Sequence, residues 1–321
     1  MKARAIIKNQ GPWWTVGILV GGLLLAVHLR VLSYVTGQDP FTYTRLAMEL
    51  LGSGFSLECL VRVAKFIVPG YPILLAGVIK MAGPFAVAWV NVVIMMMAFG
   101  LLIRLLRRWG FSAGASLIIC WAAIWLVFRS GDLNAHYVFF AFRGAAQFLF
   151  IVGAYSLVDK AVPASRGGGV RLALATGLLL IGATIRETAL LAWPALALWV
   201  VLNPEWRGAR IRGLGWLAGP LVTVLVTGLL AGWAMDVALN QQAVLWLRHL
   251  LEGGGGGYWI RFTQYVHLLH HLEWGWIGVG FCALGLWHLR ARLHIAMLWI
   301  LPALLGIAFY SGYRVHRRYL L

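Results

Sequence analysis

Charged residues are scarce in this chain, and acidic residues are the scarcest of them. Of its 321 residues only 12% are charged, and 10 Asp and Glu residues stand against 27 Lys and Arg residues. Soluble domains carry about 25% charged and about 45–50% apolar residues. Because 61% of this chain is hydrophobic, a soluble globular protein is excluded.

Cysteines and internal repeats are also lacking. Cys59, Cys120 and Cys282 are widely separated, and two of them lie inside apolar runs, so no disulfide framework is expected. No segment repeats another, whereas many transporters are built from two related halves. The sequence therefore argues against a transporter.

Long apolar runs are abundant. A run of about 20 apolar residues matches the hydrocarbon core of a bilayer. The run over 172–202 is broken by Arg186 and Glu187, which predicts two short spans meeting at a polar turn. We therefore predict an all-α polytopic membrane protein with about nine transmembrane helices, forming a single transmembrane domain over residues 1–321. The apolar runs cover 13–34, 85–106, 111–128, 137–158, 172–202, 214–235, 275–289 and 294–310.

Basic residues cluster at the ends of these runs. With nine spans the clusters all fall on one face, which the positive-inside rule assigns to the cytoplasm. This predicts an integral protein of a bacterial inner membrane with a retained first span, a cytoplasmic N-terminus and a C-terminus on the outer face. The positive charge then reflects topology and anionic lipid, and nucleic acid is not expected as a partner. The clusters are Lys2, Arg4 and Lys8; Arg104, Arg107 and Arg108; Lys160, Arg166 and Arg171; Arg207, Arg210 and Arg212; and Arg290 and Arg292.

Two long segments, 35–84 and 236–274, are predicted to lie on the outer face, which also carries most of the acidic residues. In the first segment, apolar residues recur at i, i+3, i+4, i+7 and i+8, while Arg45 and Glu49 pair on another face. This pattern predicts an amphipathic helix on the membrane surface. The apolar stretch 71–82 is too short to span and is expected to lie half-embedded beside that helix. The recurring residues are Tyr43, Leu46, Ala47, Leu50 and Leu51.

The order of several motifs resembles a family of membrane enzymes. Asp39 follows the first predicted span in GQDPFTYTRLAMELL, and the chain continues with PGYPILLAGVIKMAGP, a span ending in LLIRLLRRWG, then ATIRETALLAWPALALW and a final HRRYLL. This order resembles the polytopic GT-C glycosyltransferases, which use polyprenyl-phosphate sugars and include protein O-mannosyltransferases and aminoarabinose transferases. The resemblance implies a glycosyltransferase that moves a sugar from a polyprenyl-phosphate donor to an acceptor on the outer face.

Such a transfer needs a base for the acceptor and cations for the departing phosphate, and one carboxylate can suffice. Asp39 is the expected catalytic base, although Asp followed by Pro40 is also a typical helix N-cap. Arg186 is expected to bind phosphate because its planar guanidinium holds two phosphate oxygens. It could instead pair with Glu187 or Asp132.

The remaining candidates are all expected to contact the substrate. Arg317 and Arg318 lie on the outer side against the positive-inside tendency, which favours phosphate binding, although a solvated chain end is the alternative. Arg129 and Asp132 are expected to form the opposite wall of the site or a simple loop ion pair. The other expected substrate contacts are Tyr43, Lys65, Tyr71 and Glu187.

A metal site is the weaker interpretation of a histidine cluster. His267, His270 and His271, with Glu273, have metal-like helical spacing, but no further ligand is evident, and a membrane-surface helix explains them better. No metal and no cofactor is therefore expected.

The alternative to an enzyme is a non-catalytic GT-C-like subunit of a larger membrane complex. It follows from the end of the chain at Leu321, where the family is expected to continue with further spans. The expected partners are thus a polyprenyl-phosphate sugar, membrane lipid and, in the alternative, other membrane subunits.

Overall fold

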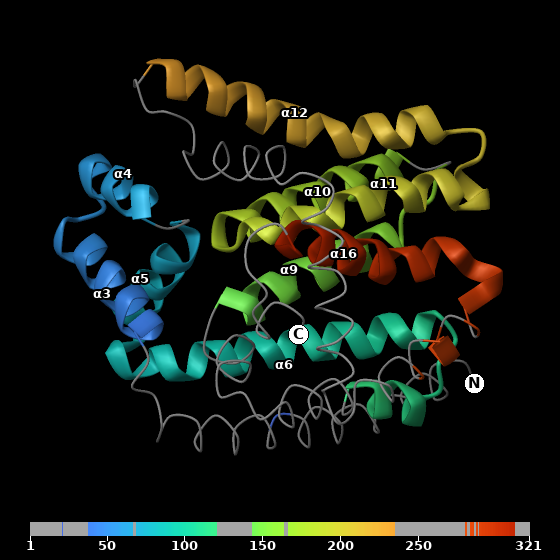
Figure 1. Ribbon diagram of the computed structural model, residues 1–321, viewed down its shortest axis with the longest axis horizontal. Coiled ribbons are helices and arrows are strands. Elements are labelled where there is room, and N and C mark those ends of the chain that lie inside the picture. Colours follow the sequence, from blue (N-terminus) through green and yellow to red (C-terminus); the bar gives the residue numbers. More distant parts are fainter. Residues whose placement is uncertain are drawn as a thin grey trace. The chain divides into compact units, whose positions relative to one another are not determined.

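The structure is a computed structural model, and it is helical wherever the chain is described (Figure 1). No strand occurs among the described residues, which confirms the all-α prediction. The described residues are 21, 38–66, 69–120, 143–163, 166–234, 280, 283–285, 287 and 289–311.

The chain divides into two compact units. Unit 1 comprises Met1–Gly153 together with Thr184–Arg186, and unit 2 comprises Ala154–Ala183 together with Glu187–Leu321. We describe each unit by itself. A single transmembrane domain over the whole chain stays a prediction.

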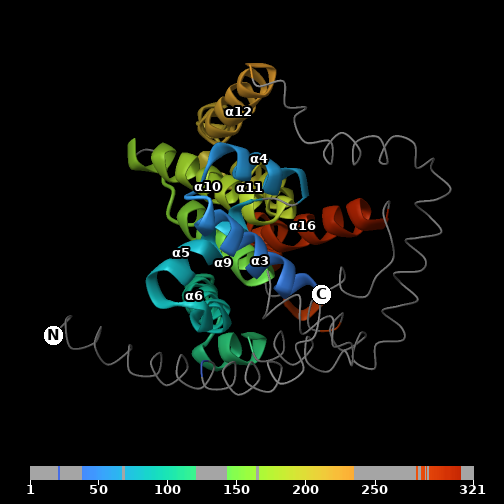
Figure 2. The same cartoon turned by 90° about the vertical axis from the view of Figure 1, so that its left-hand side faces the viewer.

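In unit 1, three helices follow one another closely before a long one. They are α3 (Gln38–Gly52), α4 (Leu57–Phe66) and α5 (Gly70–Ala82), and a short helix, η1 (Pro84–Ala86), then leads into α6 (Val87–Arg108). The turn after α3 reverses the chain through positive φ at Gly54 and Phe55, both at 61°. As a result α3, α4 and α5 lie together (Figure 2).

The predicted apolar stripe of α3 is buried, but against protein. Tyr43, Leu46, Ala47 and Leu50 are all buried, and α3 packs on α5, whose Leu75 is also buried. The periodicity therefore predicted the correct face of the helix. The prediction that 71–82 lies beside this helix is also confirmed, since α5 packs on α3. The membrane-surface location of both helices stays a prediction.

The predicted Arg45–Glu49 pair is present, and Arg62 of α4 joins it. Arg45 Nε lies 3.7 Å and Arg62 Nη2 lies 3.3 Å from the Glu49 carboxylate. The pKa of Arg62 is raised by its hydrogen bond to the Cys59 sulfur and then by Glu49. These exposed contacts join α4 to α3, although surface pairs of this kind contribute little to stability because water and salt screen them.

Unit 2 is built from longer helices. Residues 154–158 of α9 (Arg143–Val158) begin it, and α10 (Arg166–Ile185) follows. Next, α11 (Trp193–Leu202) packs along α16 (Leu293–Ser311) (Figures 1 and 2). A further helix, α12 (Arg210–Ala234), packs on α11. The short helices η3 (Glu187–Ala192), η4 (Pro204–Trp206) and η5 (Arg290–Arg292) lie between them.

The apolar run over 172–202 folds as a helical hairpin, as predicted. α10 ends at Ile185, and η3 begins at Glu187 after one intervening residue, Arg186. The first arm starts earlier than expected, at Arg166, and its 20 residues rise about 30 Å. The return arm, made of six 3₁₀ residues and 10 α-helical residues, rises about 27 Å.

Three helices of unit 2 meet at one backbone carbonyl. The Leu217 oxygen of α12 accepts hydrogen bonds from Thr176 Oγ1 of α10 at 2.9 Å and from Trp193 Nε1 of α11 at 3.3 Å. Pro220, one turn further along α12, cannot donate to the helix and loosens the backbone at this point. The two side-chain donors therefore tie α12 to the hairpin.

We expect Thr176→Val to destabilise the protein by about 0.6–2 kcal/mol, because it removes a buried interhelical hydrogen bond with little change in shape. Thr223→Val is the matched control, since Thr223 Oγ1 also donates at 2.9 Å but to Gly219 of its own helix, at an exposed position. Thermal unfolding of both variants in detergent measures the difference. Equal melting temperatures would show that the Leu217 carbonyl does not hold the helices together.

One described helix, Gly167–Ile185, is long and apolar enough to cross a membrane. The number of about nine spans is therefore not supported by the described residues. Several predicted spans, among them 13–34 and most of 275–289, lie largely outside them.

Candidate functional site

In unit 1, the start of α5 lies directly against the corner of the hairpin. A Cβ atom on Gly70 would lie 2.4 Å from the carbonyl oxygen of Thr184 and 2.5 Å from its Oγ1. Such distances are far shorter than van der Waals contact, so only glycine fits here. The glycine of the PGYP motif thus contacts Thr184, which precedes Arg186 by two positions. The two segments are far apart in the sequence.

Tyr71 follows Gly70 and joins α5 to α3. Its ring lies edge-on to the ring of Tyr43, with centroids 5.3 Å apart and planes at 88°. Tyr71 is 1% exposed and Tyr43 is 5% exposed. An edge-to-face pair of this kind contributes about 0.5–1.5 kcal/mol beyond its buried area. The pair positions α3 on α5, and substrate contact by either tyrosine stays a prediction.

Asp39 is the second residue of α3, which begins at Gln38. The helix thus starts two residues earlier than it would if Asp39 were its N-cap and Pro40 its first residue. Asp39 stands one turn before Tyr43, about 6 Å along the helix axis.

Arg186 occupies the corner between α10 and η3 and is partly exposed. Its backbone belongs to unit 1 together with Thr184. Through Gly70 and the tyrosine pair, the corner is connected to the first turn of α3. Arg186, Tyr71, Tyr43 and Asp39 all belong to unit 1, and a shared cavity for Asp39 and Arg186 stays a prediction.

The other predicted site residues are placed only in part. Lys65 lies in the last turn of α4, and Glu187 is the first residue of η3. Their contacts with substrate stay predictions. Outside the described residues lie Arg129, Asp132, Arg317, Arg318, His267, His270, His271 and Glu273. In the part of the chain that the structure describes, no three His, Cys, Asp or Glu residues are grouped to hold a metal ion.

Sequence reasoning missed the Gly70–Thr184 contact. PGYP was recognised as a motif, but nothing in its composition identifies the segment that touches its glycine. A glycine at the first position of an apolar helix is a signal of close backbone approach, and here it would have been informative.

Comparison with known proteins adds no relative: no family, curated protein or solved structure matches this chain.

We expect Gly70→Ala to destabilise the protein by about 1–3 kcal/mol, because the new methyl group forces the backbone of α5 away from Thr184. Gly77→Ala in the same helix is the matched control, since a Cβ there meets nothing within 4 Å. Alanine also favours a helix interior over glycine, so the control should be neutral or stabilise by up to about 1 kcal/mol. Thermal unfolding compares the two, and an unchanged melting temperature for Gly70→Ala would contradict the contact.

Proposed function

We propose that the chain is an integral membrane protein. The support is the apolar surface of its long helices. On α12, Val222 and Leu225 are each more than half exposed, and residues 213–235 include no charged residue. On α6, Val93 and Met97 are exposed in the same way. Soluble monomers rarely expose continuous apolar surface of this extent, whereas lipid covers it without cost.

Helix length supports the same proposal. α6, α10, α12 and α16 have 22, 20, 25 and 19 residues, which corresponds to about 28–38 Å each. The hydrocarbon core of a bilayer is about 30 Å thick. About nine spans, a cytoplasmic N-terminus and an outer C-terminus in a bacterial inner membrane remain our proposal for the whole chain.

We further propose that the protein is a GT-C-type glycosyltransferase acting on a polyprenyl-phosphate sugar. The observation that carries this proposal is the contact of the PGYP glycine with the Thr184–Arg186 corner. It brings two motifs of the resemblance together in the unit that also holds Asp39. The transfer requires a cation and a carboxylate at one reacting centre, and we propose Arg186 and Asp39 for these two roles.

In the proposed reaction, an acceptor hydroxyl or amine attacks the anomeric carbon of the donor sugar. The bond between that carbon and the phosphate oxygen breaks, and polyprenyl phosphate leaves with the bonding electrons. Asp39 takes the proton of the acceptor, and Arg186 stabilises the charge that develops on the phosphate.

The test is transfer by the purified protein reconstituted in lipid vesicles. Radiolabelled polyprenyl-phosphate sugars are supplied with a membrane extract as the source of acceptor, and labelled product is separated from donor. We expect transfer from at least one donor above the level of protein-free vesicles. Lack of transfer from every donor would contradict the enzymatic proposal.

A non-catalytic subunit is the second candidate. The burial of Tyr43 and Tyr71 favours it, because two of the expected substrate contacts are used to pack helices. For this candidate, the chain would co-purify with other membrane proteins in mild detergent and show no transfer alone.

A further inference from the structure

Three basic loops gather at one end of unit 2. Trp206 of η4 is fully buried, and its Nε1 donates to the Ala161 carbonyl oxygen at 3.2 Å. Arg212 Nη2, at the start of α12, donates to the Pro163 carbonyl oxygen at 2.9 Å. These two bonds hold the loop after α9 against the loop that follows α11.

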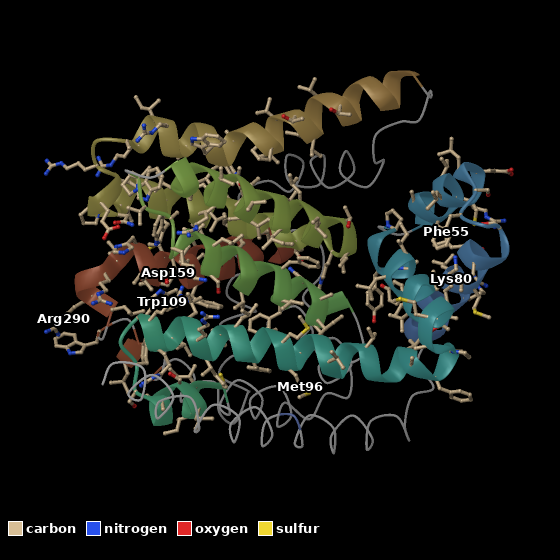
Figure 3. All side chains as sticks on the ribbon, turned by 180° about the vertical axis from the view of Figure 1, so that it is seen from behind. Phe55, Lys80, Met96, Trp109, Asp159 and Arg290 are labelled. Carbon is tan, nitrogen blue, oxygen red and sulfur yellow. The ribbon has the colours of Figure 1, made fainter. Side chains whose placement is uncertain are left out.

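The start of α16 joins the same end. The centroid of the His294 ring lies 6.0 Å from that of Trp199, near the end of α11. Burial and the charge of Arg292 lower the pKa of His294, and the charges of Glu205 and Asp159 oppose this shift. Figure 3 shows Asp159 and Arg290 toward the same end of the unit 2 helices. We call this region the basic end and define it by Lys160, Arg171, Arg207, Arg210, Arg212, Arg290 and Arg292.

The charges of the basic end are poorly balanced. Its loops contain only two acidic residues, Asp159 and Glu205, against the cations that define it. Arg212 is engaged with a carbonyl, as described above. Arg207 and Arg210 are exposed, and neither forms an ion pair or hydrogen bond with the residues that the structure describes. These two guanidinium groups are available to an external anion.

Apolar side chains lie beside these cations. Ile211 is 89% exposed next to Arg210, and the exposed Trp287 carries the Arg290 guanidinium 3.9 Å from its ring centroid. Ile211 and Val222 share one face of α12, so an apolar track leads from the cations along the helix. A free phosphate ion or a nucleic acid would leave this track in water. A lipid would cover it while its headgroup met the cations.

We propose that the basic end binds the phosphate headgroup of an anionic phospholipid, with Arg207 and Arg210 as the headgroup ligands. The acyl chains lie along Ile211 and Val222 of α12. Arg is suited to the headgroup because its fork holds two phosphate oxygens at once. Exposed tryptophans such as Trp287 sit preferentially at the level of lipid headgroups.

This site is separate from the candidate catalytic site. The basic end is built from residues of unit 2, whereas Asp39 and Arg186 belong to unit 1. The proposal rests on the membrane location proposed above but not on glycosyl transfer. Its test therefore uses lipid binding as the readout, and membrane fractionation of the expressed protein checks the location independently.

The test is native mass spectrometry of the detergent-solubilised protein titrated with phosphatidylglycerol or phosphatidylcholine. We expect the wild type to retain phosphatidylglycerol preferentially. We expect the double variant Arg207→Gln/Arg210→Gln to bind it about 30-fold more weakly, since each cation near the headgroup contributes about a factor of five. The control Arg45→Gln/Lys80→Gln removes the same charge from exposed positions in unit 1 and should bind as the wild type does.

Several outcomes would overturn the proposal. They are equal retention of the two lipids, unchanged binding by the Arg207/Arg210 variant, or an equal loss in the control variant. Displacement of the lipid by millimolar inorganic phosphate would assign the site to a free anion. Thermal unfolding of each variant verifies that a loss of binding is not a loss of fold.

Discussion

Asp39→Asn should reduce sugar transfer by about 10²–10⁴-fold while the protein stays folded. An amide cannot take a proton from the acceptor at neutral pH, so a general base is lost completely. Asp39 lies in the first turn of α3, where the loss of a negative charge costs about 0.3–1 kcal/mol, so we expect the protein to stay folded. Transfer of radiolabelled sugar and thermal unfolding are measured on the same preparation.

Glu49→Gln supplies the matched control for this variant. It makes the same carboxylate-to-amide change on the same helix, but Glu49 pairs with Arg45 and Arg62 on an exposed face. We expect full transfer and a stability loss within about 1 kcal/mol. If Asp39→Asn transfers sugar as fast as Glu49→Gln does, Asp39 has only a structural role in the first turn, and the non-catalytic subunit becomes the better proposal.

Arg186→Gln should reduce transfer by about 10²–10³-fold, the usual cost of losing one group that stabilises developing charge. Glutamine keeps much of the length and polarity of the side chain but carries no charge. Arg186→Lys should fall between Arg186→Gln and the wild type, because lysine keeps the charge but cannot hold two oxygens in a fixed plane. Both kcat and KM for the donor are measured, since the phosphate is charged before and during the reaction.

The control here is Arg45→Gln, which removes an exposed arginine from the side of α3 opposite to the buried Tyr43. It should transfer sugar as the wild type does. Normal kcat and KM in Arg186→Gln would remove Arg186 from the site, whatever happens to its stability. A lowered melting temperature with normal transfer would show that Arg186 serves only to stabilise the corner.

Features that depend on local patterns were predictable from the sequence. The i, i+4 spacing of Arg45 and Glu49 predicted their pair, and the break at Arg186 predicted the hairpin, because a charged residue inside an apolar run favours a helix end. The buried side of α3 was predicted for the same reason. In each case the interacting residues are less than two turns apart or belong to one continuous run.

Contacts between distant segments were not predictable. Thr176 and Leu217 are 41 residues apart, and neither sequence neighbourhood indicates that one hydroxyl will meet one particular carbonyl. The same holds for Gly70 and Thr184. Periodicity shows which face of a helix is buried but not which side chains bury it, and so the sequence predicted α5 beside α3 without the Tyr43–Tyr71 contact. The candidate site depends on such distant contacts, which is why its residues could be named but not its geometry.

The 3₁₀ segment η3 sets both the length of the return arm of the hairpin and the rotation of α11 about its axis. Six 3₁₀ residues rise about 12 Å, and the same residues in an α-helix would rise about 9 Å. Rewinding η3 would therefore shorten the return arm by about 3 Å. It would also turn α11 by about 120°, because a 3₁₀ helix advances about 120° per residue and an α-helix about 100°. The buried face of α11, with Leu196 and Trp199, would then no longer meet α16. The 3₁₀ form of this short segment is thus what allows α11 to pack on α16.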